Sequence, residues 1–195
     1  MVSRKKIKQR PSVQELKGEL HRIRYRRRYR TVIKSTFISL LAVAALAVLV
    51  ATLLLPVLQI YGNSMTPTLQ DGEIVVSIKN TDMKQGDVIA FYFNNKILVK
   101  RVIAQQGDWV NMDEDGTVLI NDRELAEPYL TEKSLGDADI EFPFQVPDGQ
   151  LFVMGDHRAT SEDSRHTVVG CVSEEQIVGK IVFRIWPLNR FGEIE

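Results

Sequence analysis

The sequence predicts a mainly β domain, a sandwich or a pair of small coiled antiparallel sheets, preceded by one transmembrane helix. Two observations predict this fold class. A single long apolar run lies near the N-terminus, and beyond it short β-branched or aromatic segments alternate with turn residues. No segment beyond the run has the periodicity of a long helix. A length of 195 residues accommodates one sizeable domain and an anchor.

The formal net charge is zero, but the charge is divided sharply along the chain. Residues 1–34 carry thirteen Lys and Arg against two acids, a net charge of +11, so residues 35–195 carry −11. Such asymmetry indicates two compartments or a nucleic-acid-binding arm. Because an apolar run follows at once, we favour a basic flank held at anionic membrane lipid, with no nucleic-acid partner.

Residues 13–23 have the pattern of a short amphipathic helix. Ser12 and Glu15 have the spacing of a capping box, which satisfies backbone N–H groups at a helix start. Apolar residues then recur at helical intervals up to Ile23. We therefore expect a short helix inside a cytoplasmic basic tail, residues 1–34.

The apolar run covers residues 37–58. It contains no charge over 22 residues, and about 20 such residues cross a bilayer core. A cleavable signal peptide is the alternative, but its apolar core would be shorter and would end at small residues. Because basic flanks stay in the cytoplasm, we expect a single-pass cell-membrane anchor at 35–58 and an extracytoplasmic domain at 59–195.

The segments beyond the anchor have strand character. Asp115-Gly116 is a strong hairpin signal between two of them. Residues 122–149 are acidic and contain Pro and Gly, so we expect a loop or excursion there, of a role that the sequence does not indicate. The expected strands are 73–79, 87–93, 96–104, 109–112, 117–121, 150–154 and 177–185.

One serine lies just beyond the anchor, in the stretch Gly62-Asn63-Ser64-Met65-Thr66-Pro67-Thr68-Leu69. Taken alone, the stretch is more typical of a linker turn, since Gly, Asn, Ser and Pro are ordinary turn residues. Three later stretches favour a nucleophile. They are Gly86–Phe91, Val99–Ile103 followed by Gly107-Asp108, and Gly155–Arg165.

In this order after a membrane span, the four motifs resemble those of bacterial type I signal peptidases, over about residues 35–190. The single span and the lack of a large insertion resemble the Gram-positive form. The resemblance implies a membrane-anchored serine endopeptidase that needs no cofactor or metal. Its partners would be exported preproteins, from which it removes N-terminal signal peptides after small residues at −1 and −3.

The resemblance also implies roles for individual residues. Ser64 would be the nucleophile and Lys100 the general base of a Ser–Lys dyad. The supporting residues would all lie in the last motif. Ser161 would hydrogen-bond the lysine, Asp163 and Arg165 would form an ion pair, and Asp156 would hold the same loop.

The chemistry fits these residue types. A serine hydroxyl is a weak nucleophile and needs an adjacent base. A lysine with an unperturbed pKa near 10.4 is protonated at neutral pH, but burial lowers its pKa. Lys100 lies between Val99 and Val102 in an apolar strand, a context that permits burial. Arg101 cannot replace it, because a guanidinium does not deprotonate in proteins.

The chain departs from the family pattern in three places. Gly62 stands where some members carry a Ser or Thr oxyanion donor, which leaves the backbone N–H of Ser64 as the surer donor. Ala104-Gln105-Gln106 precedes Gly107-Asp108 where the family usually has a run like Gly-Leu-Pro. His157 stands where Asn is common. None of these differences removes a proposed catalytic side chain.

Four apolar residues match positions that flank the nucleophile and the base. They could line shallow pockets for small substrate side chains, or they could be ordinary core residues, since apolar side chains are usually buried. These four residues are Ile60, Met65, Leu69 and Val99.

Two other functions remain open at this stage. A Ser–His–Asp hydrolase would use His157 or His166, but the chain lacks a Gly-x-Ser-x-Gly motif. A membrane-tethered non-catalytic binding module, or an inactive relative, is the non-enzymatic alternative. The single Cys171 cannot form an internal disulfide, and Cys and His show no metal-ligand spacing.

Overall fold

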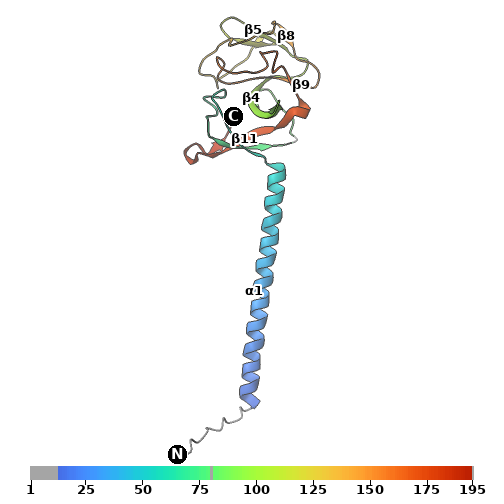
Figure 1. The fold of residues 1–195 in the computed structure, drawn as a ribbon, viewed down its shortest axis with the longest axis vertical. Helices are drawn as coiled ribbons and strands as arrows, with labels where there is room; N and C mark the ends of the chain where they lie inside the picture. The colour runs from blue at the N-terminus through green and yellow to red at the C-terminus, as the bar shows by residue number, and fades with distance from the viewer. Residues whose placement is uncertain (1–12, 80, 195) are drawn as a thin grey trace, which may run out of the picture. The chain divides into compact units, whose positions relative to one another are not determined.

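The computed structural model describes residues 13–79 and 81–194 (Figure 1). The chain divides into two compact units, one up to Val50 and one from Ala51 onward. Each unit is described by itself.

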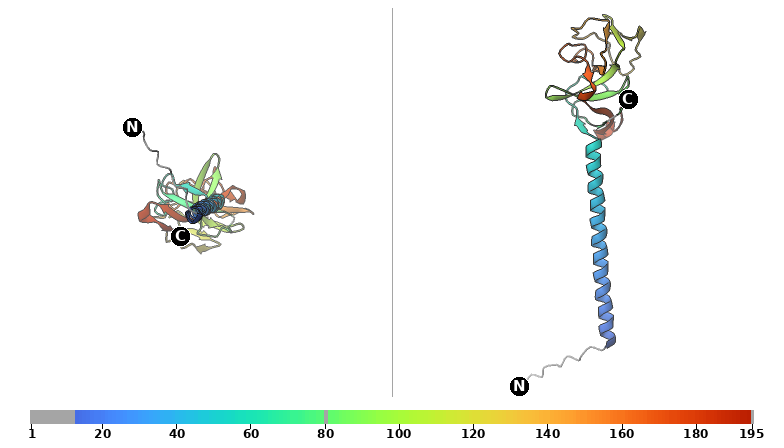
Figure 2. Two further views of the ribbon diagram at one scale, coloured as in Figure 1. Left: turned by 90° about the horizontal axis from the view of Figure 1, so that it is seen from below. Right: turned by 90° about the vertical axis from the view of Figure 1, so that its right-hand side faces the viewer.

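The first unit contains most of helix α1, Val13–Leu54, whose last turn belongs to the second unit. Figure 2 shows α1 as one uninterrupted helix. The expected short helix and the anchor are therefore continuous, since no proline lies between them. Ser12 of the expected capping box lies outside the described residues. Among the described residues, α1 is the one helix long and apolar enough to cross a membrane, and its apolar window is not buried.

The helix ends at Leu54, so the prediction that the anchor helix reaches residue 58 is wrong. Pro56 lacks a backbone N–H and disfavours the helical conformation of Leu55. The next residues form strand β1, Val57–Gln59, which pairs with β2 of the second unit. Continuous apolarity concealed this change from helix to strand.

The second unit contains an eight-stranded antiparallel sheet. Its order is β1-β2-β11-β3-β4-β9-β10, and β12 pairs with β11. Register shifts in the pairings of β11 and β4 mark irregular, bulged positions. Besides β1, its strands are β2 Ile74–Ile78, β3 Val88–Phe93, β4 Lys96–Ala104, β9 Gln150–Met154, β10 Val172–Ser173, β11 Ile177–Trp186 and β12 Gly192–Glu193.

A second antiparallel sheet has four strands in the order β7-β6-β5-β8. They are β5 Trp109–Met112, β6 Val118–Ile120, β7 Arg123–Glu124 and β8 Phe144–Gln145. Between β7 and β8 the excursion is irregular. Two short 3-10 helices, η1 Glu174–Gln176 and η2 Leu188–Arg190, adjoin β11.

The predicted fold class is confirmed. Each of the seven expected strands is present within one residue of its predicted ends. The strands that the sequence did not indicate are two or three residues long, too short for an alternating pattern.

Three apolar clusters form the core of the second unit. The cluster beneath the serine turn contains Met65 and Leu69, packed with Val75, Ala90 and Ile181. A second cluster joins the four-stranded sheet to β4 and β9, and a third packs around β3 and β9. The first cluster fixes the turn that carries Ser64, since side chains in a packed core have few alternative positions.

Candidate active site

The turn that carries Ser64 is closed at its base by two backbone hydrogen bonds. Ile60 N–H donates to the carbonyl of Glu73 at 2.8 Å, and Gly72 N–H donates to that of Ile60 at 2.9 Å. Inside the turn, Gly62 N–H donates to the Asp71 carboxylate at 2.7 Å. Gly62 has φ +84°, a conformation that glycine adopts without strain. The backbone is thus fixed on both sides of the serine.

Lys100 reaches this serine from strand β4. The register pairs Lys100 with Ile89 of β3, and the lysine is only 3% exposed. Its Nζ lies 2.9 Å from Ser64 Oγ, within hydrogen-bond distance. The structure therefore brings together the two residues that the sequence proposes as nucleophile and base.

Burial lowers the pKa of Lys100 from its ordinary value of 10.5, because the charged ammonium loses hydration. The Asp163 carboxylate opposes this shift, and the Arg165 guanidinium adds to it. These two charges act in opposite directions, and desolvation, the largest cause, decides the direction of the shift. A neutral amine next to a serine hydroxyl can accept its proton.

The loop after β9 contacts the nucleophile from the other side. His157 N–H donates to the Ser64 carbonyl at 3.0 Å. At Gly155 an added Cβ would lie 2.5 Å from that carbonyl oxygen and 2.2 Å from Ser161 Oγ. Only glycine fits there, because the two serines approach its backbone so closely.

The same loop holds the expected Asp163–Arg165 ion pair, with Arg165 Nε 2.8 Å from Asp163 Oδ1. Asp163 Oδ2 also accepts the Gly155 N–H at 2.9 Å. Asp163 and Arg165 are 0% and 1% exposed. Their pairing avoids the cost of an isolated buried charge and fixes the start of the loop.

Asp156 binds Arg101, the residue after the proposed base. Arg101 Nε and Nη2 lie 2.9 and 2.8 Å from the two carboxylate oxygens, a bidentate pair with both residues 2% exposed. Thr68 of the serine turn also donates to Asp156. Asp156 therefore connects three elements, the loop, strand β4 and the serine turn.

Comparisons with known proteins place the chain in a family. The family model described as signal peptidase, peptidase S26, matches residues 31–186. The chain belongs to this family. Its members are serine endopeptidases that remove signal peptides, and the membership confirms the resemblance drawn from the four motifs.

Individual relatives agree with the family. Signal peptidase IB of Staphylococcus aureus is 40% identical over 153 residues, covering 68% of this chain and 78% of that protein. Signal peptidase I of Streptococcus pneumoniae is 32% identical over 173 residues, covering 69% and 83%. A crystal structure of a signal peptidase I from Enterococcus faecalis aligns with TM-score 0.42 and 28% identity, over 51% of this chain and 97% of that chain.

The expected hydrogen bond between Ser161 and Lys100 is not formed in the structure. Ser161 Oγ is buried and has no hydrogen-bond partner among the described residues. It lies against the backbone of Gly155 instead.

The four apolar candidates are largely buried. Ile60, Met65 and Leu69 are 4%, 2% and 0% exposed, and Val99 packs against the same cluster while remaining half-buried. Leu69 therefore behaves as a core residue. For Ile60, Met65 and Val99, contact with substrate stays a prediction.

Neither histidine of the last motif is placed as a base. His157 Nδ1 lies 2.7 Å from Thr160 Oγ1, and His166 Nδ1 lies 3.4 Å from Asp139. Ser64 Oγ has Lys100 as its hydrogen-bond partner among the described residues. A Ser–His–Asp triad has no support in this geometry.

The sequence did not indicate a second group of arginines near the serine turn. Arg184 and Arg190 both bind the buried Glu73 carboxylate. Arg184 also donates to the Thr68 carbonyl, and Arg190 donates to the Pro67 carbonyl at 3.2 Å. The sequence around Glu73 gives no sign of this pairing, because the burial of Glu73 follows from tertiary packing.

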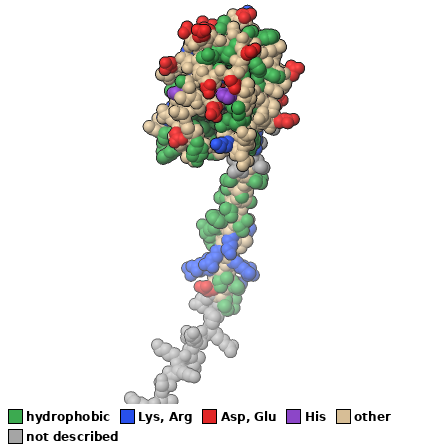
Figure 3. Space-filling view, turned by 45° about the horizontal axis from the view of Figure 1, so that its top comes forward, with side chains coloured by type: hydrophobic (Ala, Val, Ile, Leu, Met, Phe, Trp, Pro, Cys, Tyr) green, Lys and Arg blue, Asp and Glu red, His purple; other side chains and the backbone are tan. Residues whose placement is uncertain are grey.

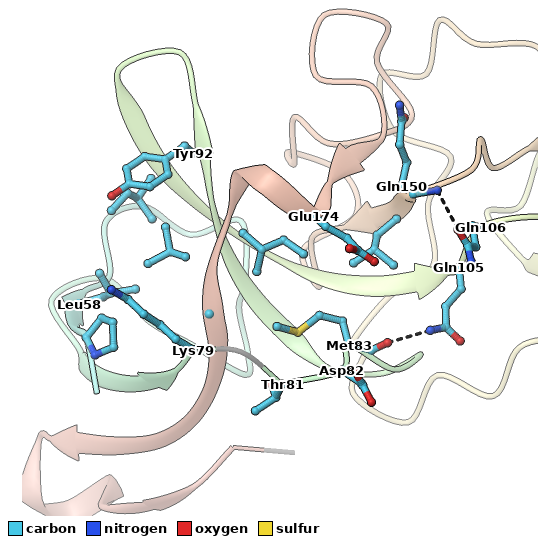
Figure 4. Close-up of a pocket in the computed structure, with 17 residues that line it drawn as sticks. Leu58, Lys79, Thr81, Asp82, Met83, Tyr92, Gln105, Gln106, Gln150 and Glu174 are labelled. Carbon is cyan, nitrogen blue, oxygen red and sulfur yellow. Dashed lines mark hydrogen bonds between the residues drawn. The ribbon is translucent and has the colours of Figure 1, made fainter. Parts of the chain in front are cut away.

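The second unit contains a pocket of about 900 Å³ (Figure 4). Leu58 and Lys79 lie at one end, and Gln105, Gln106 and Gln150 at the other. Neither Ser64 nor Lys100 lines it. Within the described residues, no cluster of three or more His, Cys, Asp or Glu side chains could hold a metal ion.

Proposed function

We propose that the chain is a membrane-anchored serine endopeptidase in which Ser64 and Lys100 remove signal peptides from exported preproteins. One observation carries the assignment of the dyad. The Nζ of a lysine that is 3% exposed, with a lowered pKa, lies 2.9 Å from the serine hydroxyl.

The reaction follows from this pair. Neutral Lys100 takes the hydroxyl proton as Ser64 Oγ attacks the carbonyl carbon of the scissile peptide bond. The resulting ammonium gives a proton to the departing amine, and an acyl-enzyme remains on Ser64. Neutral Lys100 then takes a proton from a water molecule as its oxygen attacks the ester carbonyl carbon. The Lys100 ammonium returns a proton to Ser64 Oγ as the ester bond breaks, and the signal peptide leaves with a free carboxyl end.

The oxyanion of the tetrahedral intermediate needs a donor. The backbone N–H of Ser64 donates no hydrogen bond among the described residues, so it remains available to a substrate oxygen. Gly62 has no side chain to add a second donor, and its φ of +84° would strain a Ser or Thr there.

The substrate would bind as an extended strand beside the dyad. Within the described sheet, β1 pairs only with β2, and residues 96–100 of β4 pair only with β3. Each strand therefore has a free edge with unpaired backbone groups that a peptide can join. The nearly buried side chains of Ile60 and Met65 leave little room, which favours small residues at −1 and −3.

The proposed topology places residues 1–34 in the cytoplasm and residues 59–195 outside, with the anchor between them. The basic side chains of α1 gather in one band, which Figure 3 shows in blue. Such clusters stay on the cytoplasmic side of a bilayer and interact with anionic lipid.

A non-catalytic binding module or an inactive relative is the alternative function. The assembled dyad disfavours it, because a binding module has no need of a buried lysine next to a serine.

The deciding experiment is cleavage of a purified preprotein by the full-length chain in detergent, with Ser64→Ala as the control. We expect cleavage by the wild type at one site after a small residue, and none by the variant. An inactive wild type that is folded, or an active Ser64→Ala, would contradict the proposal.

A further inference from the structure

The excursion between β7 and β8 contributes a buried carboxylate behind the proposed site. Glu127 binds Arg158 of the last motif through both guanidinium Nη atoms, with Arg158 Nη1 3.2 Å from Glu127 Oε2. Both side chains are 1% exposed. A buried arginine needs such a partner, because an unpaired charge in the interior is costly.

A tyrosine two residues later extends this contact to the strand of the base. Tyr129 donates its hydroxyl proton to Glu127 at 2.9 Å. The guanidinium carbon of Arg101 lies 4.0 Å from the centre of the Tyr129 ring, a cation–π distance. The ring thus covers the Arg101–Asp156 pair.

The excursion also supplies backbone acceptors. Arg165 Nη1 donates to the carbonyls of Leu135 and Ser134, at 2.7 and 3.3 Å. Gly136 follows with φ +63°, and an added Cβ would lie 2.6 Å from the Arg158 carbonyl oxygen. This close packing shows that the excursion and the loop after β9 are fitted to one another.

The charges of this region balance only when Glu127 is included. Three arginines, Arg101, Arg158 and Arg165, are 1–2% exposed. The sequence motif contributes two buried carboxylates, Asp156 and Asp163. The Glu127 carboxylate is the third, and it is the partner of the arginine to which the motif gave no role.

A short path of contacts connects Glu127 to the nucleophile. Arg158 Nε donates to the Gly155 carbonyl at 3.2 Å, and Arg165 Nη2 donates to the Arg158 carbonyl at 2.9 Å. These bonds fix the loop whose His157 N–H holds the Ser64 carbonyl. The orientation of the Ser64 N–H and Oγ depends on that carbonyl, since all belong to one residue.

We infer that Glu127 is a positioning residue of the peptidase, which holds Arg158 and Tyr129 and thereby the loop that orients Ser64. The inference rests on the proposed function. Glu127 does not touch substrate, because its side chain is 1% exposed. Through that loop Glu127 sets the position of Ser64 relative to Lys100, and a small displacement of either residue lowers the rate of cleavage.

The test compares three full-length variants in detergent, Glu127→Gln, the double variant Glu127→Gln with Arg158→Met, and Glu124→Gln. Glu124 is the matched control, a glutamate of the adjoining strand whose side chain is 64% exposed. For each variant we would measure kcat and KM on a preprotein across pH, and the thermal midpoint.

We expect Glu127→Gln to lower kcat about 10²-fold with little change in KM, as for a misplaced reacting group. Its thermal midpoint should fall, because Arg158 is left unpaired. The double variant removes that unpaired charge, so its midpoint should recover while kcat stays low. Glu124→Gln should match the wild type.

Recovery of kcat together with stability in the double variant would overturn the inference, since Glu127 would then only stabilise the fold. An unchanged kcat in folded Glu127→Gln would also overturn it. The same holds if kcat reaches the wild-type maximum at high pH and only its rise from acid pH is shifted. If Glu127→Gln does not fold, kcat of the folded double variant decides. An inactive wild type would instead contradict the proposed function.

Discussion

Arginine occupies two opposite environments in this chain. In the second unit Arg101, Arg158 and Arg165 are 1–2% exposed, and each binds a carboxylate. In α1 the arginines between positions 22 and 30 are exposed, and the Arg22–Glu19 contact is 3.8 Å between side chains 77% and 66% exposed. The buried arginines fix geometry through their hydrogen bonds, whereas the exposed ones contribute charge alone.

Substitutions in the two environments should have different effects on stability. Breaking a buried ion pair leaves an unpaired charge and costs about 3–5 kcal/mol, whereas an exposed pair contributes about 0–1 kcal/mol. Lys100 is a third case. It is buried like the motif arginines, but its hydrogen-bond partner is a neutral hydroxyl, so burial favours the uncharged amine.

The largest effect is expected for Lys100→Arg, which makes this position a permanent cation. A guanidinium does not deprotonate, so the general base is lost, and kcat should fall by about 10²–10⁴-fold. The measurement is preprotein cleavage, with Lys100→Ala as the comparison. Equal inactivity of the two variants would show that charge does not suffice, whereas an active Lys100→Arg would exclude the dyad.

The pH dependence of the wild type sharpens the same contrast. Because burial lowers the pKa of Lys100, the fraction of neutral amine rises with pH at values below those of an exposed lysine. The rate should therefore rise through one limb and level off. The free energy of unfolding should also rise with pH. At pH values between the lowered pKa of folded Lys100 and 10.5, the unfolded chain binds a proton at this lysine that the folded chain does not. Lys100→Met should flatten that rise in stability.

The next effect is expected for Asp163→Asn, which leaves the Arg165 guanidinium without its carboxylate. Both side chains are at most 1% exposed, so the loss of stability should reach about 3–5 kcal/mol. Activity should fall as well, because Asp163 also holds Gly155. Denaturation and cleavage would be measured together. Lost activity with unchanged stability would instead indicate that Asp163 acts directly in catalysis.

The sequence predicted the elements whose signals are local. Alternating apolar residues and turn residues predicted the long strands, and four ordered motifs pointed to the serine and lysine that the structure brings within hydrogen-bond distance. The sequence did not indicate strand β1, because apolar residues occur both in membrane-spanning helices and in protein cores. Its residues, 57–59, continue the apolar run of the anchor and were assigned mostly to it. Pro56 was the only local sign of the boundary.

The buried pair of Glu127 and Arg158 had no local signal in the sequence. Glu127 is one glutamate in an acidic excursion, and nothing in its neighbours marks it as buried. Its burial follows from tertiary packing against Arg158, a residue that the motif contains but that sequence reasoning left without a partner. For Ser161 the error was the reverse. The resemblance predicted a hydrogen bond to Lys100, and the structure does not contain it.

A smaller effect is expected for Gly136→Ala, which changes packing but no charge. An added Cβ would lie 2.7 Å from Arg165 Nη1, and φ is +63°. The combined strain should cost about 1–3 kcal/mol and lower the cleavage rate. Gly149→Ala is the matched control, because Gly149 has φ +68° with open space around it. Equal losses in both variants would show that the contact with Arg165 is unimportant.

The smallest effect is expected where the arginines are exposed. Replacing all six arginines between positions 22 and 30 by lysine keeps the charge of the band, so topology and cleavage should not change. Replacing them by glutamine removes about 1 kcal/mol of attraction to anionic lipid per residue and should allow some inverted molecules. Protease added to intact spheroplasts measures this, since it should digest residues 59–195 and spare the N-terminal tail of the wild type. A loss of cleavage in the lysine variant would mean that these arginines, like the buried ones, act through specific hydrogen bonds.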